Sequence, residues 1–145
     1  MDWKRMAIEE LKQYSWRKES LSNIPERIKQ INTEMARIKS ATTDGTPVNG
    51  GGNHREDRLI ELIMTKGELE ENLVIAKRRI RLIEKGLNGI SEQERKILEL
   101  FYINRQRDCA TRLSEDLGYE KRHIYNLKDA ALRKYVLSMY GAIEP

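Results

Sequence analysis

The chain has little of what stabilises a small secreted domain or binds a metal ion. Its 145 residues include one cysteine, Cys109, and two histidines, His54 and His123. One cysteine cannot form an internal disulfide, and the two histidines have no Cys or His neighbours at the spacing of a zinc site. We therefore expect no disulfide framework, no metal site and no other cofactor.

Long apolar runs are also missing. No stretch approaches the roughly 18–20 apolar residues of a membrane helix, and the first residues, MDWKRMAIEE, lack the apolar region of a secretion signal. The sequence therefore predicts a cytoplasmic protein with no membrane partner. Lys and Arg exceed Asp and Glu by 27 to 23, a formal charge of +4, which permits an acidic partner without requiring one.

Proline and glycine are few, and they mark breaks in the chain. The densest cluster of glycines lies in TTDGTPVNGGGNHRED, residues 42–57, together with Pro47. This composition does not suit a helix interior or a strand, so we expect a flexible loop here. The segment NGGGN lacks the Lys and Ser or Thr of a phosphate-binding loop, and it is interpreted as a linker.

Apolar residues recur at spacings of three and four on both sides of this loop, which is typical of paired heptad helices. The series are Ile24, Ile28, Ile31, Met35 and Ile38 before the loop, and Leu59, Leu62, Leu69, Leu73, Ala76, Ile80, Ile83 and Leu87 after it. We expect residues 1–87 to form one helical unit. It starts with an amphipathic helix that begins at Asp2, and an antiparallel coiled-coil hairpin follows.

A second domain is expected over residues 88–145. Gly86 and Gly89 are interpreted as helix-ending or turn glycines, and Ser91 with Glu94 has the pattern of a capping box. Helices are predicted at about residues 92–103, 109–116 and 120–138, and no segment alternates like a strand. The predicted fold class is therefore all-α: an N-terminal helix, a hairpin and a three-helix C-terminal domain.

The last two predicted helices have the spacing of a helix-turn-helix. Gly118 suits the left-handed turn between two helices that cross steeply. The small or apolar positions around it are filled by Leu113, Ser114, Leu117, Tyr119, Ile124 and Leu127. The alternative interpretation is an ordinary helical hairpin with a glycine turn.

The first turns of the last helix carry side chains that can read DNA. Lys121 or Arg122 can donate to guanine, and Asn126 can bond adenine through two hydrogen bonds. Tyr125 can contact a thymine methyl group or a phosphate. The remaining candidates are Glu120, His123 and Lys128 on the same segment, and Arg105, Arg107 and Arg112 as phosphate contacts. A solvated basic face is the alternative for each arginine, and a surface histidine without a role is the alternative for His123.

The C-terminal segments ISEQERKILELFY and LSEDLGYEKRHIYNLKDAALRKY resemble region 4 of bacterial sigma factors, which reads the minus-35 promoter element. With the heptad hairpin and the PVNGGGN loop, the whole chain is similar to small Gram-positive phage proteins of the ArpU and RinA type of late transcriptional regulators. The sequence departs from the sigma pattern at INRQRDCATRL, which lacks a turn glycine, and it has no counterpart of sigma region 2. The resemblance implies a phage or prophage transcriptional regulator without enzymatic activity.

Double-stranded DNA, RNA polymerase and a second copy of the chain are the expected partners, the last two through the coiled coil. Two other classes of protein remain open. A DNA-packaging subunit of the small-terminase type also joins a helix-turn-helix to a coiled coil, and it assembles into rings. A coiled-coil adaptor whose tail binds protein would show no salt-sensitive affinity for DNA.

Overall fold

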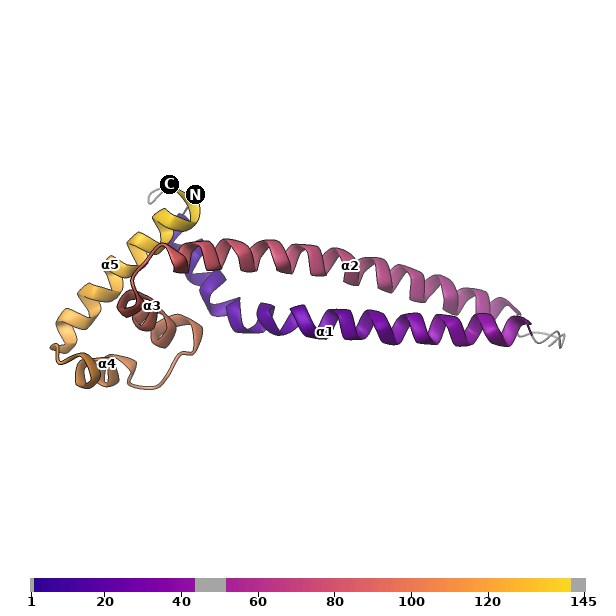
Figure 1. Ribbon diagram of the computed structural model, residues 1–145, viewed down its shortest axis with the longest axis horizontal. Coiled ribbons are helices and arrows are strands. Elements are labelled where there is room, and N and C mark those ends of the chain that lie inside the picture. Colours follow the sequence, from indigo (N-terminus) through magenta and orange to yellow (C-terminus); the bar gives the residue numbers. More distant parts are fainter. Residues whose placement is uncertain (1, 44–51, 142–145) are drawn as a thin grey trace. The chain divides into compact units, whose positions relative to one another are not determined.

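The computed structural model describes residues 2–43 and 52–141, and every regular element in these ranges is helical (Figure 1). The elements are α1 (Trp3–Thr43), α2 (Gly52–Asn88), α3 (Glu92–Leu98), the π-helical turn η1 (Glu99–Ile103), α4 (Cys109–Leu117) and α5 (Lys121–Tyr140). The predicted all-α class is confirmed. None of these described helices combines the length and the apolar character that crossing a lipid bilayer requires.

Helix α1 is longer than the sequence suggests. Asp2 begins it, since its Oδ1 accepts a hydrogen bond from the backbone N–H of Arg5 at 3.0 Å. The helix then continues to Thr43 with Pro25 inside it. The expectation of a separate first helix is therefore wrong. The segment RKESLSN, residues 17–23, contains good helix formers and no glycine, and Pro25 removes only one backbone donor.

The helices extend into both ends of the loop that is predicted over residues 42–57. Residues 42–43 belong to α1, and residues 52–57 belong to α2. Arg55 supports this extension, because its Nη1 donates to the carbonyl oxygen of Ala41 at 3.4 Å. The middle of the predicted loop, residues 44–51, lies outside the described residues.

Contacts divide the chain into two compact units, Met1–Lys18 with Arg78–Pro145 and Glu19–Lys77. We call them the terminal unit and the hairpin unit. The boundary predicted near residue 88 falls inside the terminal unit, where the end of α2 contacts α1 and α5. The hydroxyl of Tyr14 donates to Glu84 at 3.2 Å, and the hydroxyl of Ser138 donates to the carbonyl oxygen of Lys85 at 3.2 Å.

The hairpin unit contains antiparallel parts of α1 and α2 (Figure 1). Arg58 on α2 donates from Nε and Nη2 to Oε1 of Glu34 on α1, at 3.1 and 2.9 Å. Ile31 on α1 and Leu62 on α2 are buried, whereas Ile28 and Leu69 are only partly buried. A pair of helices buries one stripe on each partner, so other faces of both helices stay exposed.

Gly86 is part of a helix-helix contact in the terminal unit. A helix-ending or turn glycine is predicted here, but Gly86 lies inside α2. A Cβ atom at this position would lie 2.5 Å from Cε2 of Tyr135, a fully buried ring on α5. Gly86 therefore allows α5 to approach α2 closely. Gly89 follows the last residue of α2, and its N–H donates to the carbonyl oxygen of Gly86 at 3.2 Å, as in a turn.

Gly86→Ala is expected to destabilise the terminal unit by about 1–3 kcal/mol, because the methyl group overpacks the contact with Tyr135. Helix propensity alone would predict the opposite sign, since alanine favours a helix over glycine by about 1 kcal/mol. Urea unfolding followed by circular dichroism measures the difference. Asn88→Ala, at the exposed end of the same helix, is the control and should change stability by no more than about 0.5 kcal/mol.

A capping box starts α3, as the sequence predicts. The Ser91 hydroxyl accepts from the backbone N–H of Glu94 at 3.1 Å, and Oε1 of Glu94 accepts from the backbone N–H of Ser91 at 3.1 Å. Lys134 on α5 lies 3.3 Å from Oε2 of Glu94. Partial burial acts to raise the pKa of Glu94, but the hydrogen bonds from Ser91 and the Lys134 ammonium outweigh it and lower this pKa below its ordinary value.

This lowered pKa predicts a pH-dependent contribution to stability. A carboxyl group with a lower pKa in the folded chain stabilises the fold above its ordinary pKa of 4.5, and the contribution is lost as the pH falls through the folded value. Glu94→Gln should therefore be less stable than the wild type at pH 7, with a difference that shrinks at lower pH. Unfolding curves at several pH values test this, with Glu92→Gln as the control. A difference independent of pH would contradict it.

Candidate nucleic-acid interface

A glycine turn joins α4 to α5. Gly118 follows α4 with φ 76° and ψ 20°, in the left-handed region that glycine adopts without steric cost. Its N–H donates to the carbonyl oxygen of Ser114 at 2.9 Å, and the Ser114 hydroxyl donates to the carbonyl oxygen of Tyr119. The left-handed turn predicted for Gly118 is therefore present, and Ser114 holds the residues that follow it.

The apolar residues around this turn form a small core. Leu113 and Ile124 are fully buried, and together with Ile97 and Ala110 they form one cluster against which Leu117 and Leu127 pack. Tyr119 is predicted to fill an apolar position next to the turn, but 42% of its surface is exposed. Its ring instead lies 4.8 Å from the ring of His123, edge to face. The core thus fixes α3, α4 and the first half of α5 together.

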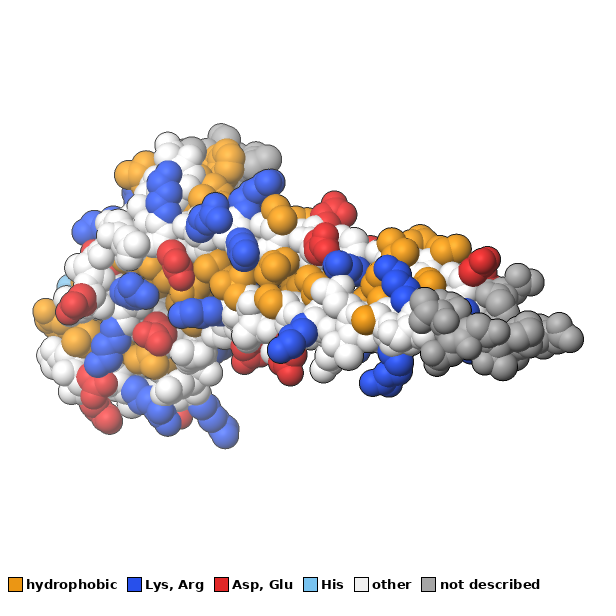
Figure 2. Space-filling view, turned by 45° about the vertical axis from the view of Figure 1, so that its right-hand side comes forward, with side chains coloured by type: hydrophobic (Ala, Val, Ile, Leu, Met, Phe, Trp, Pro, Cys, Tyr) orange, Lys and Arg blue, Asp and Glu red, His pale blue; other side chains and the backbone are white. Residues whose placement is uncertain are grey.

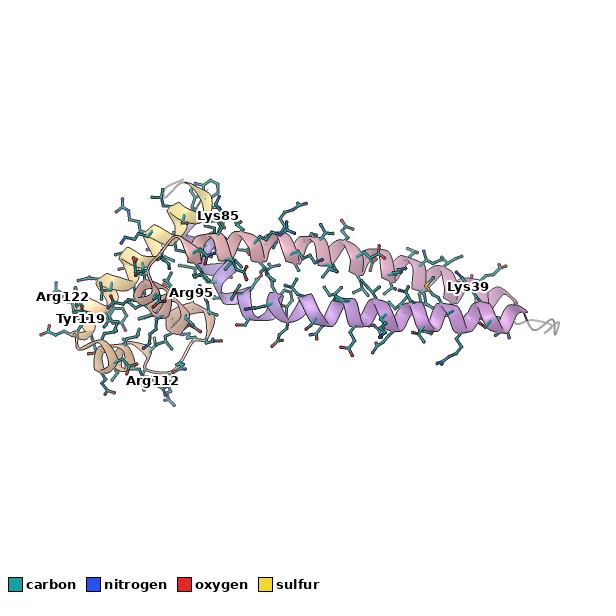
Figure 3. The ribbon with its side chains drawn as sticks, in the orientation of Figure 1. Lys39, Lys85, Arg95, Arg112, Tyr119 and Arg122 are labelled. Atoms are coloured by element: carbon teal, nitrogen blue, oxygen red, sulfur yellow. The ribbon has the colours of Figure 1, made fainter. Side chains whose placement is uncertain are left out.

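The predicted base-reading residues lie on the outside of α5. Lys121, Arg122 and Asn126 are exposed, as are Glu120 and His123. Arg122 and Asn126 are four positions apart and so share one face of the helix. Figure 3 places Arg122 and Tyr119 at the end of α5 that meets α4, and Arg112 on α4. The first turns of α5 therefore present cationic and amide groups to solvent.

A groove of about 790 Å³ runs beside this face, within the terminal unit. We call it the basic groove. Its lining residues are Lys12, Phe101, Tyr102, Arg105, Gln106, Arg107, Asp108, Cys109, Ala110, Thr111, Lys121, Tyr125 and Lys128. The groove brings together five of the predicted site residues: Arg105, Arg107, Lys121, Tyr125 and Lys128. The others, Glu120, Arg122, His123, Asn126 and Arg112, do not line it.

One wall of the basic groove is the connection between η1 and α4. The N–H of Asn104 donates to the carbonyl oxygen of Glu99 at 2.8 Å, and the Arg112 guanidinium donates to the side chain of Gln106. Asp108 then takes φ 57° and ψ 36°, a left-handed conformation immediately before α4. The sequence lacks a turn glycine here, and aspartate is among the few other residues that tolerate this conformation. Helix α4 consequently starts at Cys109.

Aromatic rings and a lysine form a second wall. The rings of Phe101 and Tyr125 lie 5.8 Å apart, edge to face. Nζ of Lys128 lies 5.4 Å from the Phe101 ring centre and 5.5 Å from that of Tyr125, and it forms an ion pair with Asp129 at 3.3 Å. These are cation–π distances. Lys128 is therefore engaged with both rings, whereas Arg105 and Arg107 on the opposite wall are exposed.

Phe101, Tyr102 and Lys12 line the groove but are not among the residues predicted for the site. The first two form an aromatic pair one residue before the basic segment NRQR, a local signal that could have indicated them. Burial raises the pKa of Tyr102, so its hydroxyl is neutral near pH 7 and can donate a hydrogen bond. Lys12 comes from α1, far away in the sequence, and no local pattern marks it.

The groups that the basic groove offers are guanidinium, ammonium, amide and aromatic groups. Such groups bind phosphate oxygens and the faces of bases. Residues 105–134 contain eight basic and five acidic side chains, so positive charge is in excess here. Among the described residues, no three His, Cys, Asp or Glu side chains gather as they would around a metal ion. The arrangement suits non-covalent binding of a polyanion.

The chain is thus an all-α protein in which a glycine turn joins two helices beside a basic groove. Residues 37–136 match the family described as "Protein of unknown function (DUF1492)", and the chain belongs to this family. The matched residues include α3, α4 and most of α5, and therefore most of the basic groove. No curated protein and no solved structure matches the chain.

Proposed function

We propose that the chain is a sequence-specific DNA-binding protein that regulates transcription. The observation that carries this proposal is the exposure of Lys121, Arg122 and Asn126 on the first turns of α5, directly after the Gly118 turn. A helix that follows such a turn can enter the major groove of duplex DNA with its first residues against the base edges. No enzymatic activity is part of the proposal.

Each group has a separate role in this proposal. Arg122 donates to guanine and Asn126 forms two hydrogen bonds with adenine, which gives sequence specificity. Arg105, Arg107 and Lys121 in the basic groove contact phosphates, which gives affinity and fixes the register on the duplex. The rings of Phe101 and Tyr125 form one wall of the groove.

The resemblance to sigma region 4 supports a site of action at a promoter, and the resemblance to ArpU and RinA type regulators supports a phage or prophage origin. The left-handed Asp108 lends further support, because it fills the place of the turn glycine that INRQRDCATRL lacks. RNA polymerase is then a natural partner, and the cytoplasm is the compartment in which such a protein acts.

A second candidate is a DNA-packaging subunit of the small-terminase type. The exposed apolar side chains of the hairpin unit favour an assembly of several chains, which both candidates require. Mass in solution separates the two classes of protein. A dimer fits the regulator, and a large ring fits the packaging subunit.

Asn126→Ala and Arg107→Ala test the assignment of roles. Duplexes selected by the wild-type chain from a random library serve as the specific ligand, and unselected duplexes serve as the reference. Asn126→Ala should weaken binding to the selected duplex by about 1–3 kcal/mol and hardly affect the reference. Arg107→Ala should weaken both, because a phosphate contact does not depend on the sequence.

The comparison contains its own control, because each variant is measured on both duplexes by fluorescence anisotropy. Equal losses on the two duplexes for Asn126→Ala would remove Asn126 from the residues that read bases. Failure of the wild-type chain to enrich any sequence would overturn sequence-specific binding itself.

A further inference from the structure

The hairpin unit carries an apolar stripe along the outside of α2. Ile60, Ile63, Met64, Val74 and Ile75 expose between 39% and 63% of their surfaces. Figure 2 shows hydrophobic side chains on the surface of the hairpin. Exposed apolar groups of this size are normal when scattered singly, but these five lie on one face of α2, in two groups on either side of Gly67. Several such groups on one face mark an interaction surface.

The apolar stripe lies opposite the face that α2 turns towards α1. Leu62 and Ala76 are buried on that inner face, at 4% and 6% exposure. At about 100° per residue, Ile60 and Val74 point away from both of these positions. The stripe is therefore a second apolar face, which the pairing of α1 and α2 leaves uncovered.

Gly67 stands in the middle of the stripe. A Cβ atom at this position would have no neighbour within 4 Å, so no contact inside the chain requires glycine. Glycine inside an exposed helix is unfavourable relative to alanine. Its presence is explained if a second helix crosses α2 at this point, since a position without a side chain lets two backbones approach closely.

The charges at the two ends of the stripe are complementary. Asp57 lies ten residues before Gly67 and Lys77 lies ten residues after it, while Ile60 and Val74 lie seven residues before and after. Both charged residues are exposed. If a second α2 crosses antiparallel at Gly67, Asp57 of each chain faces Lys77 of the other, Ile60 faces Val74, and Glu71 faces Ile63.

A parallel crossing would have the opposite effect. It would place Asp57 against Asp57, Lys77 against Lys77 and Glu71 against Glu71 of the other chain. Like charges in direct opposition are destabilising, so the pattern of charges selects the antiparallel arrangement. An antiparallel pair of identical helices is also related by twofold symmetry. The contact is then closed, and it gives a dimer rather than an open-ended polymer.

We propose that the apolar stripe of α2 binds the same stripe of a second copy of this chain, antiparallel and centred on Gly67. The proposal deepens the expected dimer of the proposed regulator, and it concerns residues of the hairpin unit alone. Its test needs no DNA, so a failure of this proposal and a failure of DNA binding can be told apart.

The first experiment measures mass in solution by sedimentation for the full chain. The wild type should be a dimer at micromolar concentration. Ile60→Lys should raise the dissociation constant by 100-fold or more, because it places a charge against Val74 of the other chain. The variant should be a monomer with the helical content of the wild type by circular dichroism, because the side chain is already exposed. Asn32→Lys, an exposed position on α1, should leave the dimer intact. A monomeric wild type, or a dimeric Ile60→Lys variant, overturns the proposal.

The second experiment tests the orientation. Asp57→Lys and Lys77→Asp, taken singly, each turn two attractive pairs into two repulsive ones by symmetry, so each should weaken the dimer by about tenfold. The double variant exchanges the two charges and should restore wild-type affinity. In a parallel dimer none of the three variants would differ much from the wild type, and that result would overturn the antiparallel arrangement.

Discussion

The double variant Lys121→Glu with Arg122→Glu is expected to bind duplex DNA at least about 100-fold more weakly than the wild type. Each lost base or phosphate contact costs about 1–3 kcal/mol, and the two new carboxylates repel the phosphates in addition. Both side chains are exposed on the first turns of α5, so the fold should be unaffected. Fluorescence anisotropy with a selected duplex gives the affinity, and circular dichroism checks the fold.

The matched control for this variant is Lys4→Glu with Lys29→Glu. Both lysines are exposed on α1, and the net charge of the chain changes by the same amount. If binding depended on net charge alone, the two double variants would lose equal affinity. That outcome would contradict a site at the start of α5.

Ile124→Ala is expected to destabilise the terminal unit by about 2–5 kcal/mol, the usual cost of truncating a buried isoleucine. Ile124 is fully buried on α5 and packs in one cluster with Ile97 and Leu113. The cavity would loosen α3 and α4 against α5 at once. Urea unfolding curves measure the loss of stability.

The control for the buried position is Leu137→Ala on the same helix, because 49% of the surface of Leu137 is exposed. Its cost should be well below that of Ile124→Ala, because much of the truncated group already contacts water. DNA affinity of Ile124→Ala should fall in step with the folded fraction. A variant that unfolds yet still binds the selected duplex would contradict binding through the packed helices.

Local signals in the sequence predicted the local structure well. Ser91 with Glu94 predicted the start of α3, and Gly118 predicted the left-handed turn, because both depend on residues within one helical turn. The prediction that Gly86 ends a helix was wrong, because its role does not depend on nearby residues. Its role depends on Tyr135, which lies 49 residues further along the chain, and no local pattern shows that contact.

The candidate site shows the same division. The exposed cations and the amide on α5 were found from their spacing to Gly118. Lys12 was missed because only the packing within the terminal unit places it beside Arg105 and Arg107. The left-handed Asp108 could not be predicted either, since aspartate adopts this conformation only where the surrounding loop requires it.

The apolar stripe was missed although its residues are plain in the sequence. The segment LIELIM, residues 59–64, contains both faces of α2, and the heptad assigned Leu59 and Leu62 to the seam. Ile60 and Ile63 lie outside this heptad. Burial separates the two faces, because Leu62 is 4% exposed and Ile63 is 54% exposed.

The dependence of DNA affinity on salt tests the central proposal most directly. Arg105, Arg107 and Lys121 are the three proposed phosphate contacts, and each such contact contributes about −0.9 to the slope of log K against log salt concentration. We expect the full chain to bind a selected duplex with a slope of about −3 per protein chain. An affinity that stays constant between about 50 and 200 mM salt would contradict a DNA-binding function for this surface.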